Sequence, residues 1–227
     1  MVEQRRVVSI VSLVVVAALV WPSTAVADDW DHVDQIDGVD IYERDAQVLG
    51  EVAFRGVTEV DVHIGEILPV FISAEERSHW VYELAEQEAL ERDEEQGLAW
   101  SERYWTRIDM PFPTTDRDFI FQAEYEIHPD DRVVTADLWT VDDERKPPQD
   151  CCVRAESITR YRLEALPGGE RTRLEVAVET DLGGRIPGWV SRQAREEWPV
   201  ETLNGMVDRA REAEHDVDER VEDWHEE

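Results

Sequence analysis

The segment 171–182 alternates between apolar and polar residues, a pattern typical of a half-buried β-strand. Leu174, Val176 and Val178 share one face of this segment, while Glu175 lies on the other. Several strands of this one-sided kind favour an antiparallel sheet that buries one face and leaves the other in water. Strands are expected at 38–42, 51–57, 90–94, 98–108, 118–127, 133–141, 153–166 and 171–182.

Helical spacing of apolar residues marks the remaining segments. Asp61 is a good N-cap residue and predicts a helix that runs to Ser73. A short helix is expected to end near Glu83, and one long helix to span Ile186 to about Ala213. The sequence therefore predicts an α+β domain, in which a curved antiparallel sheet of about seven strands surrounds a long C-terminal helix. A sheet that curls around a helix leaves an apolar cavity, where a ligand would sit.

Two shorter segments flank this domain, which we place at 28–213. The C-terminal stretch 214–227 is highly charged, so we expect a frayed helix or a solvated acidic tail there. The N-terminal stretch 1–27 has the three parts of a secretory signal peptide in order: two arginines, an apolar run and a group of small residues.

Cleavage of this signal is expected between Ala27 and Asp28, which exports the mature chain to the periplasm or outside the cell. An uncleaved membrane anchor is the alternative. The apolar run 7–20 has 14 residues, however, whereas a membrane-spanning helix needs about 20. We therefore favour export.

The chain is strongly acidic, with a formal net charge of −31. Nucleic acids are bound through clustered lysines and arginines, and anionic lipids attract basic surfaces, so this charge argues against both partners. The two cysteines, Cys151 and Cys152, are adjacent. They either form a disulfide with each other or remain two small thiols at the start of a strand. Two ligands are too few for a structural metal site, and we expect no metal and no cofactor.

Motifs of nucleophilic or metal-assisted catalysis are absent from the sequence. It contains no G-x-S-x-G, no phosphate-binding G-x-x-x-x-G-K and no H-E-x-x-H. Its six histidines are scattered. The sequence therefore predicts no catalytic residues.

Four motifs, in order, resemble those of the START (StAR-related lipid-transfer) family. They are G-V-D-I-Y-E-R at 38–44, P-F-P-T-T-D-R-D-F-I at 111–120, G-G-R-I-P-G-W-V at 183–190 and P-V-E-T-L at 199–203. The resemblance spans most of residues 30–212. It implies a helix-grip fold and a non-catalytic, START-like lipid-binding domain over 28–213. It also implies a partner that is a lipid or another hydrophobic small molecule, with transient membrane contact, and we expect a monomer.

The resemblance places Arg117 and Asp118 where a polar head group would be bound. The alternative, which we favour, is that this pair ties a loop to its strand. Sterol-carrying members often have a second arginine six residues later, where this chain has Ala123, which argues against a sterol-type polar anchor. The residues predicted to form the cavity wall or the lid are Tyr104, Arg117, Phe121, Trp139, Tyr161, Leu163, Leu174, Val176, Val178, Trp189, Val190 and Met206.

Two other functions remain open from the sequence. One is an enzyme of the wider helix-grip superfamily, such as a cyclase or hydrolase acting on an apolar substrate. It would need buried polar groups at the centre of the cavity. The other is an envelope interaction module, in which the acidic surface or the stretch 214–227 meets a protein partner.

Overall fold

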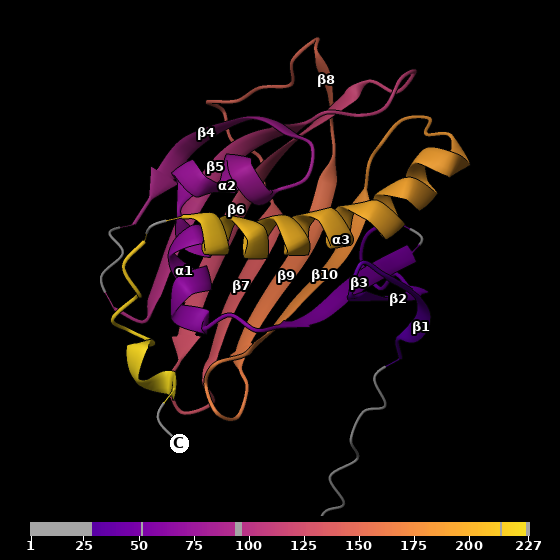
Figure 1. Ribbon diagram of the computed structural model, residues 1–227. Helices are drawn as coiled ribbons and strands as arrows, with labels where there is room; N and C mark the ends of the chain where they lie inside the picture. Colours follow the sequence, from indigo (N-terminus) through magenta and orange to yellow (C-terminus); the bar gives the residue numbers. More distant parts are fainter. Residues whose placement is uncertain (1–28, 51, 94–96, 214, 226–227) are drawn as a thin grey trace, which may run out of the picture.

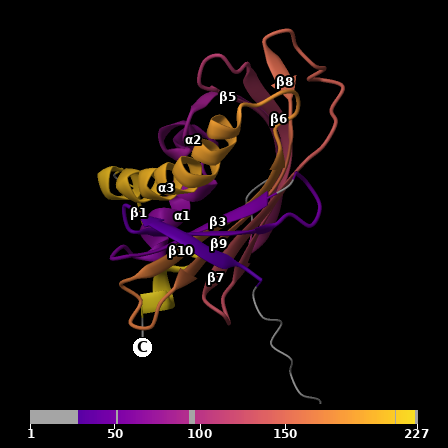
Figure 2. The same cartoon turned by 90° about the vertical axis from the view of Figure 1, so that its right-hand side faces the viewer.

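The computed structural model describes residues 29–50, 52–93, 97–213 and 215–225. Ten strands in this part of the chain form one sheet in the order β1-β2-β3-β10-β9-β7-β6-β5-β4, and β8 pairs with β6 outside this path. The sheet is strongly curved, and all three α-helices lie on its concave side (Figures 1 and 2). Neighbouring strands are antiparallel except β6 and β8, which are parallel.

The strands are β1 (Asp31–Ile36), β2 (Val39–Asp45), β3 (Val52–Val60), β4 (Leu84–Arg92), β5 (Ala99–Ile108), β6 (Asp116–His128), β7 (Val133–Thr140), β8 (Cys152–Arg154), β9 (Glu156–Ala165) and β10 (Thr172–Asp181). The helices are α1 (Ile64–Ile72), α2 (Ala74–Trp80), α3 (Gly188–Glu212) and the short 3₁₀ helix η1 (Glu222–His225). No helix within the described ranges is both long and apolar enough to cross a bilayer. The predicted signal peptide, 1–27, lies outside those ranges.

The α+β class and the long C-terminal helix are confirmed, but the sheet has ten strands where about seven were expected. β1 escaped prediction because it is a polar edge strand that leaves five of its six residues exposed. Residues 90–92 of the expected strand 90–94 form the end of a longer strand, β4, whose Glu, Ala and Leu residues favour helix, and residue 94 lies outside the described ranges. The expected strand 153–166 is divided at Ala155 into β8 and β9.

The two short helices begin at residues that accept hydrogen bonds from their first turns. His63, rather than Asp61, caps α1, since its Nδ1 accepts from the backbone N–H of Gly65 at 3.0 Å. Ser73 caps α2 in the same way and accepts from the N–H of Glu76 at 3.3 Å. Such caps satisfy backbone donors that have no partner inside the helix.

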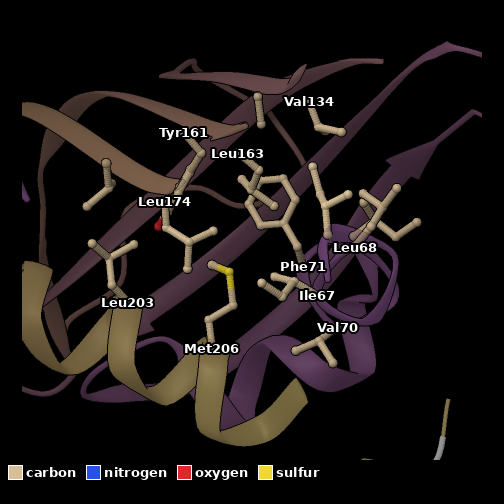
Figure 3. Packing of buried hydrophobic residues seen from close by; sticks show 14 of the residues in the cluster. Ile67, Leu68, Val70, Phe71, Val134, Tyr161, Leu163, Leu174, Leu203 and Met206 are labelled. Carbon is tan, nitrogen blue, oxygen red and sulfur yellow. The ribbon is translucent and has the colours of Figure 1, made fainter. Parts of the chain in front are cut away.

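The helices and the sheet enclose one apolar core. Met206 from α3 and Leu174 from β10 approach each other there, beside Phe71 of α1 (Figure 3). The close approach of α3 to the sheet depends on Gly56 in β3. A Cβ at this position would lie 2.8 Å from the Cβ of Pro199 and 3.3 Å from Cδ1 of Leu203. A glycine therefore allows the helix to pack directly on the β3 backbone.

The C-terminal segment 215–225 packs against the body of the domain. Val221 is fully buried and Trp224 is 6% exposed, and both belong to the apolar core. The backbone N–H of Asp218 donates to the carbonyl of Gly65 in α1 at 3.2 Å. The expectation of a frayed helix or solvated tail is wrong for these residues. Their few apolar side chains are too widely spaced to give a recognisable pattern, although two of them are buried.

The segment 141–155 covers part of the convex face. Lys146, the only lysine in the chain, lies with its Nζ 4.3 Å from the ring centroid of Trp105 and 2.5 Å from Glu88 Oε2. Arg154, on β8, donates to the carbonyl of Lys146 at 3.0 Å. Between them, Cys151 and Cys152 are bonded to each other as a disulfide, the first of the two alternatives that the sequence left open.

Candidate ligand-binding site

A cavity of about 760 Å³ lies between the concave face of the sheet and the three α-helices. Its volume is in the range of about 300–1,000 Å³ that is usual for small-molecule sites. Exposed residues of four loops surround its opening, which we call the mouth. They are Gly50, Glu83, Asp109, Pro111, Asp181 and Gly184.

Aromatic side chains form most of the wall. Phe119 and Phe121, two residues apart on β6, stack with their centroids 5.4 Å apart, and Tyr104 of β5 lies 5.6 Å from Phe121. The ring of Phe54, on β3, meets the ring of Trp198 edge-on at a centroid distance of 6.3 Å. Trp198 lies on α3, which we call the lid helix, so this contact joins the sheet to the lid. The wall is therefore large, apolar and rigid, and suits a hydrophobic ligand.

The inner end of the cavity, farthest along β5 from the mouth, carries a buried ion pair. Nη2 of Arg77, from α2, donates to the Glu102 carboxylate, and the hydroxyl of Tyr125 donates to Oε1 of Glu102 at 2.7 Å. The guanidinium of Arg77 also lies 4.1 Å from the ring centroid of Tyr104. Arg77, Tyr104 and Tyr125 line the cavity, so its inner end is polar while its sides are apolar.

The ionisation of these groups follows from their burial. Burial raises the pKa of Tyr104 to about 12, with the Glu102 charge adding to the effect and Arg77 opposing it. Burial raises the pKa of Tyr125 and Tyr161 as well. Burial disfavours the charged form of Arg77, but the hydrogen bond to Glu102 and the negative charge of that carboxylate outweigh burial, so the pKa of Arg77 is raised. Neutral tyrosines and a charged arginine therefore face the ligand space at neutral pH.

Arg117 lies at the mouth, where it is 2% exposed and bonded to the backbone of the segment before α3. Its Nε donates to the carbonyl of Leu182 at 2.5 Å, and its Nη2 donates to the carbonyl of Gly183 at 3.0 Å. Burial lowers the pKa of this guanidinium. The geometry favours the structural alternative, in which Arg117 ties the lid segment to the sheet.

Asp118 ties β6 to β8 and to Trp105 on the convex face of the sheet. Its Oδ2 accepts from Nε1 of Trp105 at 2.8 Å and from Nη2 of Arg154 at 2.8 Å. Adjacent residues of a strand point to opposite faces, so Arg117 and Asp118 fasten different segments to one strand. Asp118 does not line the cavity.

Six of the predicted site residues do line the cavity: Tyr104, Arg117, Phe121, Tyr161, Val178 and Val190. Four more point to the same side of the sheet or helix but are packed in the apolar core below the cavity: Leu163, Leu174, Val176 and Met206. Whether any of these residues contacts a ligand stays a prediction.

Trp139 and Trp189 lie outside the cavity lining. Trp139 pairs with Gln122 and Ile158, one position out of step with the cavity-facing Leu138, so strand alternation places it on the convex face. Trp189, in the first turn of α3, is 50% exposed and faces away from the core. Its position in the motif indicated a lid residue, but helix rotation turns its neighbour Val190 inward instead.

Sequence reasoning missed Arg77, which lines the cavity, and its buried partner Glu102. Arg77 is in a short helix of mostly polar residues, and Glu102 is one of 54 acidic residues in the chain. One signal was available: Glu102 shares strand parity with Tyr104, a predicted wall residue. Nothing in the sequence indicated that α2 would lie over this position.

Comparison with known families assigns the chain. Residues 25–215 match the family model of the START domain. The chain belongs to the START domain family. It is 28% identical over 204 residues to the uncharacterized protein PA1579 of Pseudomonas aeruginosa, an alignment that covers 87% of this chain and 95% of that protein.

Solved START structures share the fold. The STAR-related lipid transfer protein of Xanthomonas axonopodis is 22% identical with a TM-score of 0.67, over 81% of this chain and 99% of that one. Human StAR-related lipid transfer protein 5 is 17% identical with a TM-score of 0.71, over 82% of this chain and 88% of that one. START domains typically bind or transfer lipids and other hydrophobic ligands. The family is mostly non-catalytic.

Proposed function

We propose that this START domain binds one amphipathic lipid in its cavity without catalysing a reaction, and that it does so outside the cytoplasm. The observation that carries the proposal is an aromatic-walled cavity of about 760 Å³ with the buried Arg77–Glu102 ion pair at the end away from its mouth. Transfer of a dozen methylene groups from water into such a cavity gains on the order of 10 kcal/mol, at about 0.8 kcal/mol each. Hydrophobic burial alone is therefore sufficient to hold a lipid.

The inner end indicates the chemistry of the ligand's polar group. Arg77 and Glu102 neutralise each other, so a ligand that brings a net charge would add an uncompensated charge to an apolar space. A neutral group that donates or accepts a hydrogen bond, such as a hydroxyl, adds no such charge. We infer that the ligand has a long apolar body and a neutral polar end.

Export remains part of the proposal and is supported by the sequence of residues 1–27. Exposed apolar residues around the mouth suit transient contact with a membrane from which the ligand would be taken. Phe112 is 93% exposed and Trp189 is 50% exposed, on the β5–β6 loop and at the start of α3. The acidic charge of the chain disfavours attraction to anionic lipids, so such contact would depend on apolar insertion.

Native mass spectrometry of the exported protein tests the proposal. The full chain is expressed in a host that exports it, purified from the envelope fraction under mild conditions and weighed before and after organic extraction. The expected result is one non-covalent adduct per chain, which the extraction identifies as a neutral-headed lipid. An empty protein that also fails to take up dodecanol would contradict the proposal. Chemical conversion of the bound molecule during incubation would favour the enzyme alternative.

A further inference from the structure

The C-terminal strap, residues 215–225, extends beyond the family match, which ends at residue 215. It is nevertheless part of the folded core through Val221 and Trp224. The strap is fastened to α1 at Gly65. A Cβ at this glycine would lie 2.5 Å from Cγ1 of Val217, so the side chain of Val217 packs directly on the backbone of α1. Figure 1 shows the strap at the end of the domain opposite the first turn of α3.

The strap places the guanidinium of Arg220 over Trp100 of β5. Arg220 is held by Asp218 through two hydrogen bonds, Nε to Oδ1 at 2.8 Å and Nη2 to Oδ2 at 2.5 Å. Its Nη1 donates to the carbonyl of Gly97 at 3.4 Å. Fixed in this way, the guanidinium lies with Cζ 4.9 Å from the ring centroid of Trp100 on β5.

Trp100 transmits this contact to the cavity wall. Its ring stacks on Tyr125 of β6, with centroids 5.0 Å apart and an interplanar angle of 3°. Guanidinium, indole and phenol thus form one row from the strap to the cavity. At the end of the row, the Tyr125 hydroxyl donates to Glu102 and accepts from Arg77 at 3.3 Å.

We propose that the strap positions the polar end of the ligand site. Arg220, acting through Trp100, fixes the Tyr125 hydroxyl against the Arg77–Glu102 pair and thereby sets the preference for a neutral polar group. Arg220 is a positioning residue, since it does not line the cavity. The inference rests on the proposed function, which it deepens by naming a determinant of selectivity outside the family match.

The test compares three amphiphiles with the same tail: dodecanol, dodecanoate and dodecylammonium. Each displaces the neutral fluorescent reporter N-phenyl-1-naphthylamine from the full chain, and the ratio of displacement constants measures selectivity. In Arg220→Leu, the preference for dodecanol over dodecanoate is expected to fall about two- to fivefold, the range of one partly exposed cation–π contact. Arg220→Lys keeps a cation over Trp100 and is expected to restore most of the preference.

Two further variants separate positioning from general stability. Val221→Ala removes core packing from the strap but leaves Arg220 in place, so it should lower stability without changing the ratio. Arg220→Gln removes the charge but keeps a polar side chain, so it serves as the milder variant if Arg220→Leu does not fold. An unchanged ratio in both Arg220→Leu and Arg220→Gln, or an equal fall in Val221→Ala, would overturn the inference. Failure of all three amphiphiles to displace the reporter from the unmodified chain would instead overturn the proposed function, and the inference with it.

Discussion

Gly56 of β3 lies directly beneath Pro199 of the lid helix, with room for a hydrogen atom but not for a methyl group. A Cβ at Gly56 would lie 2.8 Å from that of Pro199. The contact is between backbone-rigid groups on both sides, so neither can yield by a change of rotamer. The height of the lid over the sheet is therefore set at this point.

Gly56→Ala is expected to lower the free energy of unfolding by about 1–3 kcal/mol, the usual cost of overpacking. Urea denaturation followed by circular dichroism measures this change. Gly188→Ala, in the first turn of α3, is the control, because a Cβ there would meet no other part of the fold within 4 Å. Equal stability of the two variants would show that the contact between α3 and β3 is not tight.

Removing one member of the buried Arg77–Glu102 pair should destabilise the domain more than replacing both members with apolar residues. Arg77→Met leaves a carboxylate buried without its cation, and we expect a loss of about 3–5 kcal/mol in the free energy of unfolding. The double variant Arg77→Met/Glu102→Leu should lose less than the sum of the single variants, since neither charge is then left unpaired. Chemical denaturation of the four proteins gives this coupling.

An exposed pair on α3 provides the comparison. Arg211 and Asp208 are 3.5 Å apart, and both side chains are more than half exposed. Arg211→Leu should change stability by less than about 1 kcal/mol. A loss in Arg77→Met no larger than this would contradict the assignment of a buried pair.

Glu179 should make the stability of the domain depend on pH. Burial alone would raise the pKa of this carboxyl, but hydrogen bonds from the N–H groups of Val48, Gln47 and Leu49, together with Arg44, outweigh burial and lower the pKa. A lowered folded-state pKa means that the charged form contributes stability above the unfolded pKa of about 4.5, and that this contribution is lost as pH falls through the folded value.

The difference in unfolding free energy between the unmodified protein and Glu179→Gln should therefore be largest at pH 7, at about 1–3 kcal/mol. It should diminish as pH is lowered below about 4.5. Urea titrations at pH 7, 5 and 3 measure this difference. The idea fails if the difference is the same at all three values or grows in acid.

Phe112 and Trp189 should matter for exchange of ligand with a membrane rather than for stability. Both side chains are exposed, so their replacement by serine should change the free energy of unfolding by less than about 0.5 kcal/mol. We expect the double variant to transfer a pyrene-labelled lipid between phosphatidylcholine vesicles several-fold more slowly. Leu98→Ser, 45% exposed and next in sequence to Gly97, which accepts a hydrogen bond from Arg220 of the strap, is the control and should transfer at the normal rate.

Much of this structure was predictable from the sequence wherever one face of an element is buried. The alternation in β10 identified Leu174, Val176 and Val178 as inward-facing, which they are. The motifs at 111–120 and 183–190 led to the family and to the mouth of the cavity. Arg117 forms the bonds to the loop before α3 that the structural alternative predicted, and whether it also contacts a ligand stays a prediction.

The failures have physical causes. β1 carries almost no apolar side chain, so nothing in its sequence distinguishes an edge strand from a loop. Trp139 was assigned to the wrong face because the bulk of an aromatic ring does not tell which side of a strand is covered, and the segment 141–155 covers part of the convex side. Arg77 reaches the cavity only because α2 is placed over Glu102 of β5. No local sequence pattern indicates this contact between two separate segments.

Lys146 places a reactive primary amine on the convex face of the sheet. Apart from the amino terminus, its Nζ is the chain's sole primary amine, and Trp105 and Glu88 shield it. The rate at which an amine-directed reagent acylates this nitrogen therefore reports how often the segment 141–155 lifts from the sheet. The same segment is fastened through Arg154 and Asp118 to β6, the strand that holds Arg117. A change in the acylation rate of Lys146 on adding ligand would therefore show that filling the cavity alters the motion of this segment on the convex face.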